Sequence, residues 1–500
     1  MSARTALLVA LALAAAGCAP GVVRTDLARH RWYELSSPHV LLYTDVDADT
    51  ARQRVAEIES WRQALVDAYA AAIAPGKAPP AGRLLVFHFH DCSDLRPVWG
   101  DHVAAMKSVS ADFQQRRAVL VCESDQDWRR RENVVHELAH AMNHHFLGAI
   151  PIWLEEGLAT YFQTVTVEGG ELVLGKISPD VLRARHYPWP VRELLALSRD
   201  ACYQPDHDCH VAAWWLVHLL NNGPDEYRAR FVRFLTGLGG AAPPDEAWND
   251  AFAGVARDRL ERDYRDHLAD GRTDLWTLPY RDAAPAAAGA PRVLRRDEVH
   301  DLWTHVLLAF GGRDRRELAA RQIDAAERDL PGWTGAHFWR AVLAKRRGDL
   351  GAAEASLRRY AASRPDDARA WIGLVEVGLL RADELHGGER AAALDDLVDE
   401  VAQVQRRART AAGADALAQY FAMRGLPSTG IGHAERAVAS DPSCAGCEET
   451  YALLSFQLGR WPDAIAHQER AIALSGEGAP PEAMMRRLAR YRAAAATPAR

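Results

Sequence analysis

The chain has 500 residues, of which 48% are hydrophobic and 25% are charged. This composition is close to that of globular proteins, so it excludes a disordered or fibrous chain and allows about three domains. The 60 Lys and Arg residues stand against 67 Asp and Glu, which gives a net charge of −7. Because there is no basic excess, the composition does not indicate a nucleic-acid-binding protein.

The N-terminal segment has the pattern of an export signal. Arg4 gives it a positive start, and Ala6–Ala16 forms a short apolar run that ends before Gly17 and Cys18. A run of this length is too short to span a bilayer and fits a signal peptide. Small residues before a cysteine resemble the lipobox of bacterial lipoproteins, with Ala15 where that motif usually has leucine.

That resemblance implies a signal peptide over residues 1–17 and a lipid on Cys18 that anchors the chain to a membrane. Ala19 follows the cysteine, and an aspartate there would favour retention in the inner membrane. The expected location is therefore the bacterial envelope, at the outer membrane and facing the periplasm. The alternative is an ordinary cleaved signal with an incidental cysteine. No other stretch approaches the 18 apolar residues of a membrane-spanning helix.

The chain has seven cysteines, and lipidation of Cys18 would leave an even number. In an exported protein the other six are disulfide candidates, and fifteen connectivities are open to them. Proximity favours two short pairs and leaves the third: Cys202–Cys209, Cys444–Cys447 and Cys92–Cys122. The alternatives are free buried thiols or, for the CxxC of residues 444–447, redox chemistry or half of a zinc site.

Predicted elements of the first 270 residues begin as mixed strands and helices and then become helical. Alternating or β-rich runs predict strands, and a helical period predicts the intervening helix. The expected strands are 39–43, 84–90 and 118–122, with an edge strand within 106–113, and the expected helix is 47–72. From about residue 125 to residue 270 the pattern predicts helices.

Residues 281–293 are rich in Ala, Pro and Gly and are predicted to be a linker. Helices follow it to the C-terminus, and part of this region repeats itself. A shift of 34 residues places Gly425 on Gly459, and His433 on His467. A period of 34 with two helices per copy is the tetratricopeptide signature. A further copy lies near 339–360, whereas the register is doubtful over 295–330 and 376–410.

The sequence His136-Glu137-Leu-Ala-His140 matches HExxH. On a helix, residues four apart lie on one face, so both imidazoles can bind one Zn²⁺. Glu137 lies beside them and can take a proton from the water that zinc activates. The alternative is a surface helix with two solvated histidines. A second helix begins after Pro151 and carries carboxylates, one of which can complete a three-ligand zinc site.

That second helix reads Trp-Leu-Glu-Glu-Gly-Leu-Ala-Thr-Tyr-Phe, from 153 to 162. Together with HExxH it resembles the gluzincin zinc metallopeptidases, in particular the peptidase MA-like group. The resemblance covers about residues 30–270 and implies that Glu156, the Glu before Gly, is the third zinc ligand after His136 and His140. It also implies that Glu137 is the general base and later the proton donor to the leaving amine.

A second group that stabilises the oxyanion is also expected from the resemblance. The helix from His210 to His218 resembles one in that family, but His210 stands where the family has a tyrosine. His210 is the first candidate and Tyr203 the second. His144 and His145 are expected to be solvated, His88 and His90 to be partly buried on one face of their strand, and residues 206–208 to form a polar loop. Trp214 and Trp215 are expected in the core.

These observations predict an α+β metallopeptidase domain over 18–280, with a small mixed sheet and zinc-binding helices. An all-α tetratricopeptide solenoid over 294–500 is expected to follow it. The leading hypothesis is a membrane-anchored zinc peptidase that acts on a peptide or protein substrate, with repeats that bind a substrate or protein partner. The alternative is an envelope scaffold that works through its repeats and carries a vestigial peptidase domain. A third option is a zinc hydrolase of another amide, such as a cell-wall bond.

Overall fold

The computed structural model describes residues 30–496, except 74–78, 81–82, 96–103, 110–115, 124–126, 148–149, 185–188, 203–208, 240–242, 272–273, 281–286, 311–314, 443 and 476–481. The signal segment with Cys18, the second candidate Tyr203 and the polar loop at 206–208 lie outside the described residues. None of the described helices is long and apolar enough to cross a membrane.

A six-stranded sheet forms the base of the N-terminal half, in the order β4-β5-β3-β2-β1-β9. Strands β2, β3 and β5 run parallel, and β1, β4 and β9 pair antiparallel to their neighbours. The bounds are β1 Tyr33–Ser36, β2 Val40–Thr44, β3 Leu84–Phe89, β4 Ala104–Val109, β5 Arg116–Cys122 and β9 Arg292–Val293. The expected strands are present, β4 lies at the edge, and β1 was not predicted.

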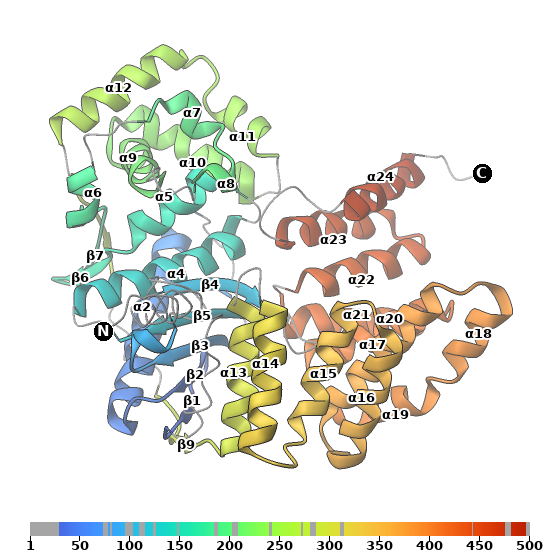
Figure 1. Cartoon of the computed structure of the whole chain (residues 1–500). Helices are drawn as coiled ribbons and strands as arrows, with labels where there is room; N and C mark the ends of the chain where they lie inside the picture. Colours follow the sequence, from blue (N-terminus) through green and yellow to red (C-terminus); the bar gives the residue numbers. More distant parts are fainter. Residues whose placement is uncertain are drawn as a thin grey trace, which may run out of the picture.

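Helices cover both faces of this sheet, because successive side chains of a strand point to opposite faces. On one face, Val86 packs with helices α2 (Ala48–Ala72) and α4 (Asp127–Leu147). On the other face, Phe87 and Phe89 pack with helix α13 (Arg296–Phe310). Figure 1 shows α4 along the upper side of the sheet, beside β4, and α13 standing beside the strands. Burial on both faces explains why the first four residues of β3, Leu84 to Phe87, are all apolar.

A smaller helical unit follows α4 and holds a three-stranded sheet, in the order β6-β7-β8. Its bounds are α5 Ile152–Phe162, β6 Thr166–Glu168, β7 Glu171–Leu174, α6 Pro179–Ala184, α7 Val191–Leu195, α8 Arg199–Cys202, α9 Cys209–Asn222, α10 Asp225–Gly239, α11 Pro244–Ala251, α12 Arg257–Asp270 and β8 Trp276–Pro279. The prediction that residues 125–270 are helical throughout was wrong at the β6–β7 hairpin.

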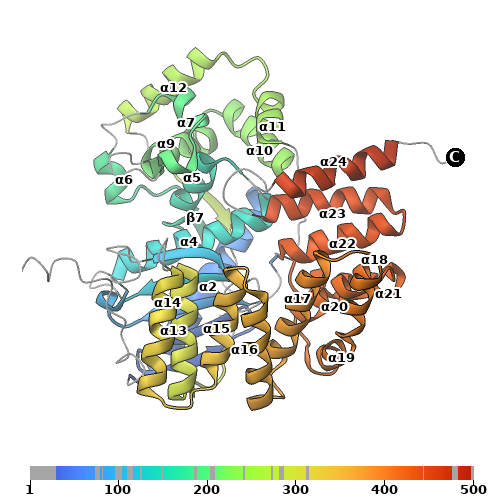
Figure 2. The ribbon, with the colours of Figure 1, turned by 45° about the vertical axis from the view of Figure 1, so that its right-hand side comes forward.

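The C-terminal half is a solenoid of antiparallel helix pairs, which Figure 2 shows stacked side by side. Beyond α13 its bounds are α14 Arg315–Asp329, α15 Gly335–Arg346, α16 Leu350–Ser363, α17 Ala368–Asp383, α18 Gly387–Asp395, α19 Val398–Arg407, α20 Ala411–Met423, α21 Pro427–Ser440, α22 Ala445–Gln457, α23 Trp461–Leu474 and α24 Glu482–Ala496. A shift of 34 residues carries the bounds of α20 and α21 onto those of α22 and α23. The repeat is interrupted after α17, where two short helices take the place of one.

The two halves share one hydrophobic core. Phe87 and Phe89 of β3 belong to the same cluster of buried residues as Trp303, Phe310 and Trp339 of the solenoid. The Phe89 and Trp303 rings meet edge to face with centroids 5.6 Å apart. The segment predicted as a linker ends in β9, which pairs with β1 of the sheet. The solenoid is therefore packed onto the sheet rather than tethered to it.

Candidate metal centre

Helices α4 and α5 form an antiparallel hairpin that holds the candidate ligands. Val135 and Leu138 of α4 are at most 1% exposed, so the apolar stripe predicted for this helix faces the core. Every residue of α5 is buried. Pro151 is the N-cap of α5 and begins the second helix soon after the first ends. This short reversal brings the carboxylates of α5 against the histidines of α4.

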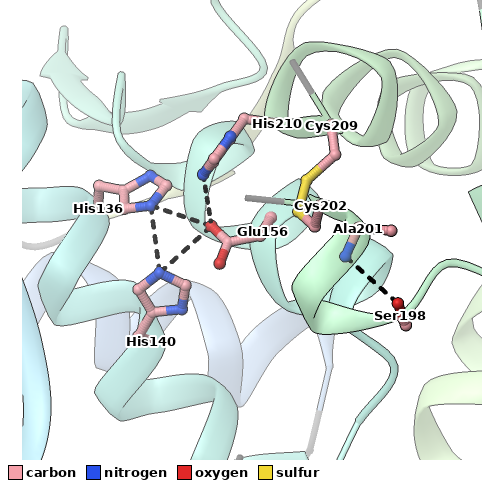
Figure 3. Close-up of a disulfide and its surroundings, with 8 residues drawn as sticks. All are labelled: His136, His140, Glu156, Ser198, Ala201, Cys202, Cys209 and His210. Atoms are coloured by element: carbon pink, nitrogen blue, oxygen red, sulfur yellow. Dashed lines mark hydrogen bonds and ion pairs between the residues drawn. A yellow bond between two sulfur atoms is a disulfide. The ribbon is translucent and has the colours of Figure 1, made fainter. Parts of the chain in front are cut away.

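His136, His140 and Glu156 converge on one point, as Figure 3 shows. Their ligand atoms all lie within 4.8 Å of one another. Oε2 of Glu156 is 3.4 Å from Nε2 of His136 and 3.5 Å from Nε2 of His140. The two Nε2 atoms are 3.1 Å apart. The structure thus brings together the three residues that the resemblance names as ligands.

The environment of Glu156 favours the charged carboxylate. Its side chain is 1% exposed, and burial alone would raise its pKa. His140, His136 and His210 surround it and together hold the pKa of Glu156 well below its ordinary value. A buried anion among imidazoles is a ligand set suited to a divalent cation.

His210 lies on the opposite side of Glu156 from α4. Its Nε2 is 3.2 Å from Oε2 of Glu156, and its side chain is 36% exposed. It belongs to the first turn of α9, directly after Cys209, which forms a disulfide with Cys202 (Figure 3). This disulfide packs against Ile152 at the start of α5. The disulfide thereby holds the first turn of α9, which carries His210, against the start of α5, which carries Glu156.

Side chains that the sequence analysis did not identify hold the hairpin in place. Gln163 Oε1 lies 3.2 Å from Nδ1 of His136. Nδ2 of Asn143 donates to the backbone oxygen of Glu155 at 3.0 Å. The hydroxyl of Tyr69, on α2, donates to Oδ1 of Asn143 at 2.5 Å. Three helices therefore fix the relative position of the ligands.

Gly157 allows α5 to lie close to α9. A Cβ at this position would be 2.7 Å from Cγ2 of Val217 and 2.9 Å from the backbone oxygen of Ala213. Ordinary contacts between carbon atoms are about 3.5–4.0 Å. The glycine after Glu156 is thus required by helix packing, which also sets the distance between Glu156 and His210.

The donor set of the triad fits zinc. Two imidazoles and one carboxylate are the three protein ligands of one common type of catalytic zinc site, which leaves a further position for water or substrate. The Nε2 and Oε2 atoms lie 3.1–3.5 Å from one another, so one small cation could contact all three. Glu137, half-buried on α4, follows His136 directly.

Other residues singled out from the sequence lie away from the triad. His88 and His90 were both expected to be partly buried, but His88 is 2% exposed and contacts Thr44 at 2.9 Å and Glu123 at 3.2 Å, whereas His90 is exposed. Trp214 and Trp215 are fully buried, as predicted. Cys444 pairs with Cys447, as proximity favours, and Cys92 pairs with Cys122, the pair that was left over. His144 was expected to be solvated, but it is half-buried and lies 3.2 Å from Glu155.

The face of α4 opposite the triad lines a cavity of about 1480 Å³ between the two halves of the chain. Leu138, Met142 and His145 of α4 form part of one wall. Helices α15, α17, α20, α22 and α24 of the solenoid form the other, with both acidic and basic side chains. Helix α4 therefore borders the candidate metal centre on one side and a large mixed-charge cavity on the other.

Comparison with known proteins finds similarity to repeat proteins only in solved structures. No protein-family model and no curated protein matches the chain. A thermophilic TPR protein of Thermus thermophilus has a TM-score of 0.33 at 17% identity, covering 40% of this chain and 100% of that one. Yeast Tom70 has a TM-score of 0.29 at 14% identity, covering 58% and 61%. The P58(IPK) TPR domain has a TM-score of 0.23 at 13% identity, covering 60% and 86%. These values are too low to support a functional argument.

Proposed function

We propose that the chain is a zinc-dependent hydrolase of peptide bonds, with His136, His140 and Glu156 as metal ligands. The observation that supports this most is the convergence of three ligand atoms within 4.8 Å from two packed helices. The resemblance of 136–140 and 153–162 to gluzincin peptidases supports the same ligand set. Bound there, zinc would supply Lewis acidity and lower the pKa of a water molecule to near neutrality.

The chain's own residues supply the remaining chemistry. Glu137, beside His136 on α4, accepts the proton of the attacking water and passes it to the leaving amine. His210 lies across Glu156 from α4 with a partly exposed ring, so it can donate a hydrogen bond to the substrate oxygen on which negative charge develops. The disulfide at Cys209 restrains the helix turn that carries this ring.

We further propose that the protein is exported and lipid-anchored through Cys18, at the outer membrane and facing the periplasm. The signal-like N-terminus supports this location, as do three disulfides, because disulfides persist in oxidising compartments. The solenoid would bind a protein substrate or partner, and its surface toward the cavity is the candidate contact region.

The second candidate function is an envelope interaction protein whose repeats are the working part. The helical repeat supports this reading, because a shift of 34 residues carries the bounds of α20 and α21 onto those of α22 and α23. The absence of the family's tyrosine at position 210 is in keeping with a vestigial site. The presence of all three ligands and Glu137 favours the enzyme.

Zinc content and proteolysis of a casein-like substrate distinguish these candidates. We expect one zinc per chain in the wild type, lost in His136→Ala, and cleavage that a chelator abolishes. Glu137→Gln is expected to retain zinc and lose cleavage. His145→Gln, on the cavity side of α4, serves as the control and should retain both. A wild-type protein without zinc at the triad would contradict the proposal of a zinc peptidase and favour the interaction protein.

A further inference from the structure

The outer ring nitrogen of His140 is buried without a hydrogen bond. Among the described residues, Nδ1 of His140 has no partner within hydrogen-bond distance. A histidine that binds metal through Nε2 carries its ring proton on Nδ1, and this N–H normally donates to a carboxylate, carbonyl or water. A buried N–H that finds no acceptor is costly, so the metal-bound ring requires one nearby.

Glu155 presents a carboxylate oxygen to this nitrogen. Its Oε1 lies 3.6 Å from Nδ1 of His140 and 3.2 Å from Nε2 of His144. The side chain of Glu155 is 5% exposed. His140 and His144 are one helical turn apart on α4, so the oxygen lies between two rings of the same helix face. A shift of a few tenths of an ångström would bring Nδ1 within hydrogen-bond distance of it.

The backbone of Glu155 is fixed independently of its side chain. Asn143 donates to the backbone oxygen of Glu155 at 3.0 Å, and Tyr69 in turn donates to Asn143 at 2.5 Å. Both residues are fully buried. The carboxylate therefore extends from a rigid point, and a rigid acceptor restricts the ring that donates to it.

We infer that Glu155 is a positioning residue for the metal centre. Its carboxylate accepts the Nδ1–H of His140 and thereby directs Nε2 toward the metal, while His144 holds the carboxylate in place. Glu155 itself is not a ligand, because its oxygen faces the outer nitrogen of the ring. This inference rests on the proposed function, since it requires a metal at His136, His140 and Glu156.

The test is zinc affinity, measured on the full-length protein by competition with a chromophoric chelator. Loss of an outer carboxylate typically weakens metal binding about 10- to 100-fold. We expect a loss of this size in Glu155→Ala, a smaller one in the isosteric Glu155→Gln, and recovery toward wild type in Glu155→Asp. His144→Gln should have a weaker effect than Glu155→Ala. His145→Gln, the next residue on α4, should bind zinc as the wild type does.

Thermal unfolding of the zinc-free variants separates positioning from a merely structural role. If Glu155 only stabilises the fold, its variants melt earlier but bind zinc within twofold of wild type, and the inference is wrong. Zinc binding by the wild type that is lost in His140→Ala but insensitive to both Glu155→Gln and Glu155→Ala overturns this inference alone. Absence of zinc binding by the wild type overturns it together with the proposed function.

Discussion

Replacement of Gly157 by alanine tests whether the contact between α5 and α9 sets the geometry of the metal centre. The new Cβ would meet Cγ2 of Val217 at 2.7 Å and the backbone oxygen of Ala213 at 2.9 Å. Val217 can turn its side chain, but the carbonyl can move only with α9. Overpacking of this kind costs about 1–3 kcal/mol. The gain in helix propensity, about 0.5–1 kcal/mol, offsets part of this cost.

The expected result is therefore a net loss of about 0–2.5 kcal/mol in the free energy of unfolding. Urea unfolding of the zinc-free protein measures it, with Gly432→Ala as the matched control. Gly432 also lies inside a helix, but its added Cβ would meet no atom closer than 3.9 Å. Alanine there should stabilise by about 0.5–1 kcal/mol. If Gly157→Ala is as stable as the control variant, the close contact does not exist as described.

Three further perturbations probe other parts of the chain. Removing both Cys92 and Cys122, which close a loop of 30 residues, should lower the free energy of unfolding by about 3–4 kcal/mol in urea unfolding, and a variant as stable as the oxidised wild type would contradict this. Burial, and after it the charge of His267, lowers the pKa of His218 to about 3. Below about pH 6.5 the unfolded state therefore binds a proton at this histidine, whereas the folded state does not. The contribution of neutral His218 to the free energy of unfolding is therefore fully present above about pH 6.5, and it falls by about 1.4 kcal/mol per pH unit toward pH 3. A His218→Gln variant whose free energy of unfolding falls with the same slope would contradict this. Phe87→Ala should cost about 3–5 kcal/mol and lower the unfolding transitions of sheet and solenoid together in calorimetry, and a shift of the sheet's transition alone would disprove the shared core.

The ligand positions could be predicted because they depend on local geometry. Residues four apart on a helix share a face in any fold. The prediction that His136 and His140 lie side by side therefore required only that the helix was predicted correctly. The 34-residue period likewise places each copy of the repeat without reference to the rest of the chain. The β6–β7 hairpin was missed although its signal is present, since Gly169 and Gly170 both adopt positive φ in a tight turn.

What depends on distant contacts could not be predicted. Asn143 is held by Tyr69, 74 positions earlier, and nothing local indicates that these two side chains meet. Helix geometry alone leaves Glu155 and Glu156 as alternatives, and the resemblance to gluzincins was needed to choose Glu156, which the structure places beside the Nε2 atoms of His136 and His140. The apolar run of β3 indicates that both its faces are covered, but not that the covering helix is α13.

The pairing of β9 with β1 and the packing of α13 on the sheet change what the Ala- and Pro-rich segment can do. The backbone N of Gly289 donates to the backbone oxygen of Ser36 at 2.8 Å, and the chain is then held at Arg292–Val293 and along α13, so the anchor points begin within the second part of the segment. Residues inserted directly after Tyr280, ahead of these anchor points, would therefore leave the solenoid in place relative to α4. The width of the cavity is set by side-chain packing and is independent of linker length.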